Sequence, residues 1–351
     1  MLIAPHAAIK ESGKELGFMI KTLKTFLTNF KEMVDKIDGN FLILLFSFMK
    51  DRMKYHMTMV DYFELTFYKK TNKEKAEYLT TIQQRDFAYA VDDVKQGRLF
   101  THKTNLYLLF KEQMGRQQLF TESMTKELFL DFTKNHNPFL FKPDFNWCGQ
   151  GIRKIDINEY ENVDDLFNEL KNEKGVLDEI LVQHTQMSQL NPCTLNSIRV
   201  FSFRINNEVK IVAAALRIGR KNVVVDNYSA GGVVCSVDVD TGRVVDLAED
   251  MYGKRYETHP DSGTVLVGFE IPNWDKVIDL VMEAADISPI NYVGWDIAIL
   301  ENRCLLIEGN FNPMLNVAQI AGGGGKKKLF EKLLQEHKQS TSSQEFLKTQ
   351  E

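Results

Sequence analysis

Two carboxylates near the C-terminal end of the sequence interrupt runs that are otherwise apolar. Asp296 lies within residues 293–300, and Glu308 lies within residues 304–310, which read as two strands joined by the polar residues 301–303. A simple hairpin over that link pairs Leu300 with Cys304 and places Asp296 opposite Glu308. Asn310 then points to the same face as Glu308, because side chains two residues apart on a strand do so.

Two carboxylates placed in this way need a compensating positive charge. Directly opposed like charges destabilise a sheet, and a buried carboxylate is costly unless it is compensated. Two carboxylates and an amide oxygen on one face suit a hard cation, so Asp296, Glu308 and Asn310 are predicted to bind Mg²⁺. The alternative is that one acid is protonated or paired with an arginine, and that the strand register differs.

Magnesium held by so few protein oxygens usually completes its shell with water and substrate phosphates. Lys142 ends an apolar strand and precedes the small loop Gly149-Gln150-Gly151, whose backbone amides suit phosphate oxygens. Arg199 and Arg217 lie in apolar strands, where an arginine generally needs an anion partner. An internal salt bridge or a solvent-facing position is the alternative for each arginine.

The elements that must position these residues follow a helical start. Helical spacing of apolar residues indicates helices up to about residue 100, with 41–49 as a buried helix face and the Met-rich segment 53–68 in the core. An adaptable binding surface is the alternative for these methionines. A third helix is predicted over 73–94, and another over 274–285. Short strands are predicted from residue 139 onward, and residues from about 339 read as a polar, frayed tail. The predicted strands are 139–142, 180–183, 198–205, 209–218, 233–239, 244–247, 292–300 and 304–310.

This order predicts an α+β fold rather than alternating βαβ units.

The composition excludes several classes of protein. The formal net charge of the 351 residues is -5, so the total gives no reason to expect affinity for nucleic acid or an anionic membrane. Four dispersed cysteines form no CxxC pair, which argues against structural zinc and a disulfide framework. The most apolar run is too short to span a membrane, and no signal peptide is evident, so a cytosolic protein is the default expectation.

The same residues, taken in order, resemble the ATP-grasp superfamily, and most closely its sugar-transfer-associated branch. The resemblance covers roughly residues 100–335. Its most specific parts are residues 226–232 and the ending formed by Asp296, Glu308 and Asn310. The other matching features are Lys142 with the glycine loop, residues 179–184, Asn196-Ser197-Ile198-Arg199-Val200, and Arg217.

The resemblance implies two α+β subdomains that clasp ATP, over residues 101–190 and 191–338, between a helical region 1–100 and the tail 339–351. It implies that Asp296, Glu308 and Asn310 hold one or two Mg²⁺ ions, and that Lys142 contacts nucleotide phosphate. Arg199 and Arg217 would lie near the transferred phosphate or the substrate carboxylate. Further nucleotide contacts are expected from Lys103, Gly149, Gln150, Gly151, Glu179, Val182, Gln183, His184 and Asn227.

The activity implied is a carboxylate–amine ligase that forms an acylphosphate, on small-molecule or sugar-linked substrates of surface-glycan or related biosynthesis. A kinase on the same fold is the enzymatic alternative, because it needs the same magnesium–ATP apparatus. A nucleotide-binding scaffold is the third possibility. The sequence predicts no nucleic acid partner and no integral membrane segment, and it leaves the oligomeric state open.

Overall fold

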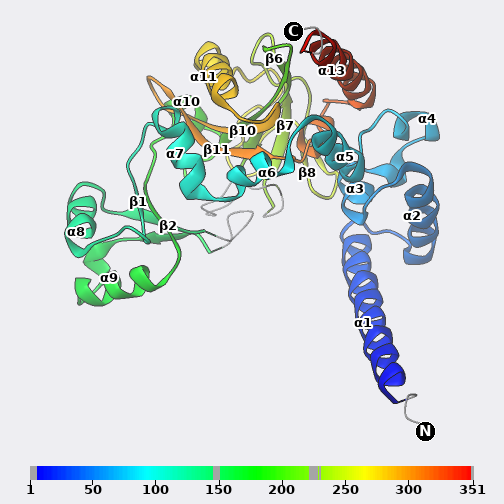
Figure 1. The fold of residues 1–351 in the computed structure, drawn as a ribbon, viewed down its shortest axis with the longest axis horizontal. Coiled ribbons are helices and arrows are strands. Elements are labelled where there is room, and N and C mark those ends of the chain that lie inside the picture. The colour runs from blue at the N-terminus through cyan, green and yellow to red at the C-terminus, as the bar shows by residue number, and fades with distance from the viewer. Residues whose placement is uncertain (1–5, 145–150, 221–227, 229–230, 349–351) are drawn as a thin grey trace.

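Two antiparallel sheets with helices packed on them follow a helical region (Figure 1). The computed structural model describes residues 6–144, 151–220, 228 and 231–348. The mixture of helices and antiparallel strands confirms the predicted α+β class, and the helical start is confirmed as well. None of the described helices is long and apolar enough to cross a bilayer.

The N-terminal region contains several short helices after two longer ones. They are α1 (His6–Lys36), α2 (Phe41–Tyr55), α3 (Met59–Glu64), η1 (Phe67–Lys69), α4 (Asn72–Lys75), α5 (Thr81–Val91), α6 (Val94–Gly97) and η2 (Arg98–Thr101). The single helix predicted over 73–94 is wrong, because Thr71 and Thr80 each form a capping box that begins a new helix.

Helix α2 differs from the buried face predicted for residues 41–49. Phe48 is buried, but Leu42, Ile43, Phe46 and Met49 are exposed. The Met-rich segment is divided in the same way, because Met57 is in the core while Met53 is exposed. Helical spacing correctly predicted the helix, but it could not tell that a second apolar face points outward.

A small four-stranded sheet forms a separate layer at one end of the molecule (Figure 1). Its order is β1-β4-β2-β3, from β1 (Gln118–Phe120), β2 (Phe139–Pro143), β3 (Arg153–Ile155) and β4 (Gly175–Glu179). The helices α8 (Lys126–Asn135) and α9 (Val163–Asn172) cover it through a core that includes Phe129, Phe141 and Leu170, and η3 (Ile157–Glu159) precedes α9. The strand predicted over 180–183 is wrong, because the paired residues are Gly175–Glu179 and the chain leaves the sheet after them.

The large sheet has seven strands in the order β11-β10-β5-β6-β7-β8-β9. The predicted hairpin between β5 and β6 is confirmed, and Asn206 and Asn207 at its turn both have positive φ, as its tight turn requires. The strands are β5 (Ser197–Ile205), β6 (Glu208–Ile218), β7 (Val233–Val237), β8 (Ala248–Asp250), β9 (Arg255–Tyr256), β10 (Tyr292–Ile299) and β11 (Cys304–Phe311).

Helices cover both faces of this sheet. Helices α7 (Lys103–Met114) and α11 (Trp274–Ile287) pack on the face that carries Ile198, Trp295 and Ile297. The opposite face carries Phe203 and Tyr292, and it shares one core with the N-terminal helices, α12 (Asn316–Gln319) and α13 (Lys327–Lys348). The short helix α10 (Thr185–Ser188) lies in the connection to β5, and α13 continues through much of the tail that was predicted to fray.

Buried amides fasten the helical region to the C-terminal part of the chain. Gln84 of α5 donates through Nε2 to the Leu79 carbonyl and to Asn316 Oδ1, both at 2.8 Å. Its Oε1 accepts a hydrogen bond from the Leu315 backbone N–H at 2.8 Å. Asn316 also donates to Glu64. One side chain therefore satisfies polar groups from both ends of the sequence.

We expect Gln84→Ala to lower the free energy of unfolding by about 3 kcal/mol, since it leaves buried donors and acceptors unsatisfied. Gln96→Ala, at an exposed position on α6, is the matched control and should cost less than about 0.5 kcal/mol. Urea unfolding measures both values. Equal losses in the two variants would contradict the role of the buried amide.

Candidate functional site

The predicted opposition of Asp296 and Glu308 is confirmed, although the register at the turn was predicted wrongly. The Leu300 N–H donates to the Arg303 carbonyl at 2.9 Å, and Ile299, not Leu300, pairs with Cys304. A β-bulge next to Asp296 leaves Ile307 as an extra residue on β11 and brings Glu308 opposite Asp296. The turn and the bulge each shift the register by one residue, and the two shifts cancel at the site.

Charged and polar side chains form a row across four neighbouring strands. Arg217 of β6 pairs in register with Ser197 of β5, and Arg199, two residues along β5, pairs with Asp296 of β10. Asp296 in turn pairs with Glu308 of β11. Because residues paired in register share a face, these side chains lie on one face of the large sheet.

Asp296 is held by two arginines. Arg199 binds it through Nε and Nη2, both at 2.7 Å, and Arg217 Nη2 lies 3.1 Å from Oδ2. Burial of Asp296 opposes its ionisation, but the arginines hold its pKa below the ordinary value. The alternative of an acid paired with arginine therefore applies to Asp296. Arg217 also donates to Ser197 Oγ at 2.6 Å, which fixes the guanidinium against β5.

Glu308 and Asn310 are placed differently from Asp296. The side chain of Glu308 makes no hydrogen bond or ion pair with any residue that the structure describes. Its burial, and then the charge of Asp296, raise its pKa. Asn310 donates through Nδ2 to the Gly294 carbonyl at 3.2 Å, which leaves Oδ1 without a described donor. A buried carboxylate that no side chain contacts directly, beside an available amide oxygen, fits a hard cation.

Asp296 has less capacity left for a cation. A carboxylate offers about four acceptor positions, and the arginine hydrogen bonds occupy three of them. Among the described residues, no three His, Cys, Asp or Glu side chains gather into a metal-binding group. The residues therefore fit magnesium through Glu308 and Asn310, with Asp296 supplying charge and one remaining position.

Lys103 was a predicted nucleotide contact, and it lies beside this cluster. It begins α7, and its Nζ donates to the carbonyls of Pro143 at 2.8 Å and Asp144 at 3.3 Å. Burial lowers its pKa, whereas the nearby Glu308 charge opposes that shift. Lys103 therefore brings a cation from α7, which packs on the large sheet, to the end of β2.

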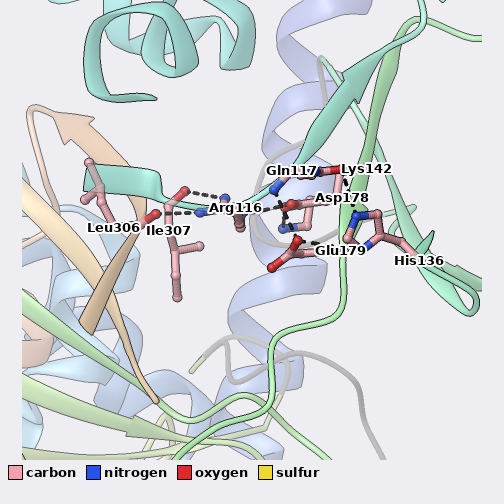
Figure 2. A network of polar contacts seen from close by, with 8 residues as sticks. All are labelled: Arg116, Gln117, His136, Lys142, Asp178, Glu179, Leu306 and Ile307. Carbon is pink, nitrogen blue, oxygen red and sulfur yellow. Dashed lines mark hydrogen bonds and ion pairs between the residues drawn. The ribbon is translucent and has the colours of Figure 1, made fainter. Parts of the chain in front are cut away.

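Lys142 is held by a carboxylate that the sequence analysis overlooked (Figure 2). Its Nζ binds Asp178 Oδ2 at 2.6 Å, and Arg116 Nε binds Asp178 Oδ1 at 2.9 Å. Arg116 also donates to the carbonyls of Leu306 at 2.6 Å and Ile307 at 3.3 Å, at the bulge of β11. Burial opposes the ionisation of Asp178, but Lys142 and Arg116 hold its pKa down at about 2. One ion-pair chain thus joins the small sheet to the strand that carries Glu308.

Two of the predicted nucleotide contacts use their side chains to hold the fold. Gln183 donates to the carbonyls of Asn191 and Thr194, and His184 caps α10 by accepting from the Gln186 N–H. Val182, which directly precedes Gln183, is 80% exposed. The backbone groups of residues 181–182 form no hydrogen bond with another described residue. A ligand beside this segment could therefore bind its backbone N–H and C=O groups.

Glu179, at the end of β4, contacts Gln117 and His136. Its Oε2 accepts a hydrogen bond from the Gln117 N–H at 3.2 Å, and it lies 3.7 Å from His136 (Figure 2). A cavity of about 560 Å³ borders it, lined also by Tyr107 and Arg303. Gly151, two residues before β3, has a φ of +74°. The predicted contacts Gly149, Gln150 and Asn227 lie outside the described residues.

The profile of the family described as sugar-transfer associated ATP-grasp matches residues 165–335. This part of the chain is an ATP-grasp domain. The match includes β4, with Asp178, and every residue of the charged row on the large sheet. No curated protein matches the chain.

Several solved structures are similar to this chain. The ATP-grasp ligase PsnB complexed with minimal precursor aligns at a TM-score of 0.44 and 16% identity, over 70% of this chain and 64% of that one. PsnB complexed with minimal precursor, Mg and ADP aligns at a TM-score of 0.41 and 17% identity, over 70% of this chain and 61% of that one. N5-carboxyaminoimidazole synthetase from Staphylococcus aureus complexed with ADP aligns at a TM-score of 0.40 and 11% identity, over 62% of this chain and 46% of that one. The chain thus spans less than two thirds of each of these proteins.

In the metal-free protein we expect Glu308→Gln to raise the free energy of unfolding at neutral pH. Glu308 has a raised pKa in the fold, so its ionised form is disfavoured there, and stability falls as pH rises from the ordinary glutamate pKa through the folded value. Glutamine removes that cost. The gain should therefore vanish below about pH 4, where both states bind the proton.

Urea unfolding in EDTA at several pH values measures this difference. The matched control is Glu283→Gln at an exposed position of α11, which should leave stability unchanged. A Glu308→Gln variant that is less stable than the wild type at neutral pH would show that Glu308 is compensated by a group not considered above.

Proposed function

We propose that this protein is a magnesium- and ATP-dependent ligase that joins a carboxylate to an amine. The observation that carries the proposal is the Glu308 carboxylate, which has no direct side-chain partner among the described residues and lies near Asn310 on β11. Arg116 and Asp178 link this strand to Lys142. Lys103 and Arg199 also lie within electrostatic reach of Glu308. Cations around an oxygen-ligand site suit a nucleotide triphosphate that arrives with Mg²⁺.

Each group has a proposed role. Glu308 and Asn310, with Asp296, would hold one or two Mg²⁺ ions, which supply charge neutralisation for phosphate oxygens. Lys103 and Lys142 would bind nucleotide phosphates. The backbone of 181–182, next to Glu179, Val182, Gln183 and His184, would face the adenine and ribose. Gly149, Gln150, Gly151 and Asn227 remain proposed nucleotide contacts.

Arg199 and Arg217 would act on the transferring phosphoryl group through their charge. Their bonds to Asp296 fix both guanidiniums before the substrate arrives, and a cation that is already oriented needs little reorganisation during the reaction. Their net charge exceeds that of the carboxylate they share. This surplus of positive charge is suited to the charge that spreads over the phosphoryl oxygens.

The proposed chemistry needs no nucleophilic side chain. An oxygen of the substrate carboxylate attacks the γ-phosphorus of ATP, ADP leaves, and an acylphosphate forms. The amine then attacks the acyl carbon, phosphate leaves, and a proton is released from the amine nitrogen. The family's description favours sugar-linked acceptors, such as a sugar acid or an amino sugar.

We expect ADP and phosphate to be released only when ATP, Mg²⁺, a carboxylate and an amine are all present. Purified protein would be assayed against panels of amino acids, sugar acids and amino sugars, with the product identified by mass spectrometry. EDTA should abolish turnover, and Glu308→Gln should lower it by about a hundredfold or more, as loss of a metal ligand removes charge stabilisation. Glu283→Gln should keep wild-type turnover.

Other product patterns would overturn the ligase. ADP release with a hydroxyl acceptor alone, together with a phosphorylated product, would establish the kinase instead. AMP and pyrophosphate would replace the acylphosphate by an acyladenylate. Wild-type turnover in Glu308→Gln would remove Glu308 from the metal site, and nucleotide binding without turnover on any panel would favour a scaffold.

We expect Lys142→Ala to weaken Mg-ATP binding by about tenfold to a hundredfold, the range for a lost hydrogen bond to a charged group. Lys154→Ala on the neighbouring strand β3 is the matched control, because Lys154 is exposed and bears the same charge. Calorimetric titration with ATP and Mg²⁺ measures both affinities. Equal affinities in the two variants would exclude Lys142 from the nucleotide site.

A further inference from the structure

Helix α2 is apolar on two opposite sides. Its inner side packs on α1 through Phe48, which contacts the rings of Phe26 and Phe30. Its outer side exposes large apolar side chains, although the helix lies at the outer edge of the molecule (Figure 1). The exposed fractions are 74% for Leu42, 67% for Ile43, 76% for Phe46, 48% for Met49 and 79% for Met53.

These outer side chains form an ordered stripe. At 3.6 residues per turn, Leu42, Phe46, Met49 and Met53 fall within about 60° of one another around the helix axis. The buried Phe48 and the other inner residues fall on the far side. Scattered exposed apolar residues need no explanation, but a continuous stripe of them marks a surface that another body covers. We name these four residues the α2 stripe.

Basic side chains flank the α2 stripe on both sides. By the same helical geometry, Lys50 and Lys54 lie along one edge and Arg52 lies along the other, and all three are exposed. The acid of this helix, Asp51, is buried and bound to Lys75 at 2.7 Å. Within α2 every exposed charged residue is basic: Lys50, Arg52 and Lys54. The outer side of α2 is thus basic in a protein whose formal net charge is -5.

We propose that α2 docks the protein on an anionic lipid bilayer, with the helix axis parallel to the membrane plane. The stripe would enter the boundary between headgroups and acyl chains, while the flanking basic side chains would reach the headgroup phosphates. An apolar row edged by cations is the pattern of an interfacial helix. The net charge of the chain concealed this patch, because acidic residues elsewhere outweigh it.

A second copy of the chain fits this surface less well. In a two-fold dimer the same patch meets itself, so Lys50, Arg52 and Lys54 would approach their own copies across the stripe. Like charges brought together in this way oppose association. An anionic bilayer instead offers the opposite charge over the whole patch, and it imposes no shape on the stripe.

The test uses the full chain and large unilamellar vesicles. Sedimentation with phosphatidylcholine vesicles that contain about a quarter phosphatidylglycerol should recover the protein, and pure phosphatidylcholine should recover about tenfold less or lower. Lys50→Gln together with Lys54→Gln should weaken binding to the anionic vesicles roughly 30-fold. Phe46→Ser together with Met53→Ser should weaken it at least about tenfold, because apolar area is lost.

The matched control is Leu108→Ser, at an isolated exposed leucine of α7, which is 71% exposed and should leave vesicle binding unchanged. Absence of binding to anionic vesicles would overturn the proposal, as would binding that both double variants retain. A dimer in light scattering that Phe46→Ser with Met53→Ser dissociates would assign the stripe to a second copy instead. Circular dichroism and ATP binding of the variants, which should equal those of the wild type, separate loss of docking from loss of folding.

Discussion

The ion-pair chain through Asp178 is the constraint on which the relation between the two sheets depends. A carboxylate withdrawn from water must be compensated, and Asp178 is fully buried. Lys142 and Arg116 provide that compensation from different elements, and Arg116 also satisfies the carbonyls at the bulge of β11. The small sheet is therefore positioned against the strand that carries Glu308 by groups that cannot separate without exposing a buried charge.

Charge is arranged on the large sheet by the same principle. Asp296 is neutralised by Arg199 and Arg217, whereas the adjacent Glu308 has no such partner among the described residues. The surroundings of these two neighbouring carboxylates therefore move their pKa values in opposite directions, down for Asp296 and up for Glu308. This difference leaves one carboxylate to orient the arginines and the other open to a cation.

The sequence was sufficient for the parts of the site that depend on strand alternation. An acid in an apolar run identified Asp296 and Glu308, and the same criterion applied to Asp178 in β4 would have found it. The alternation of residues in β11 gave no sign of the bulge at Ile307. The Ile307 carbonyl at the bulge accepts a hydrogen bond from Arg116, which lies far away in the sequence. The outer face of α2 was missed for a related reason. Helical spacing gives the faces of a helix, but tertiary packing decides which of them is covered.

The helical region and the large sheet share one core, so the boundary of the family match is not the boundary of a folding unit. The family match begins at residue 165, yet Phe203 and Tyr292 of the sheet pack directly against Phe87 of α5. A fragment that begins at residue 165 would leave those rings in water, and it would also contain β4 without β1 and β2 beside it. Truncation to the matched residues should therefore give an aggregating chain, and the N-terminal helices have to be inherited and expressed together with the domain that follows them.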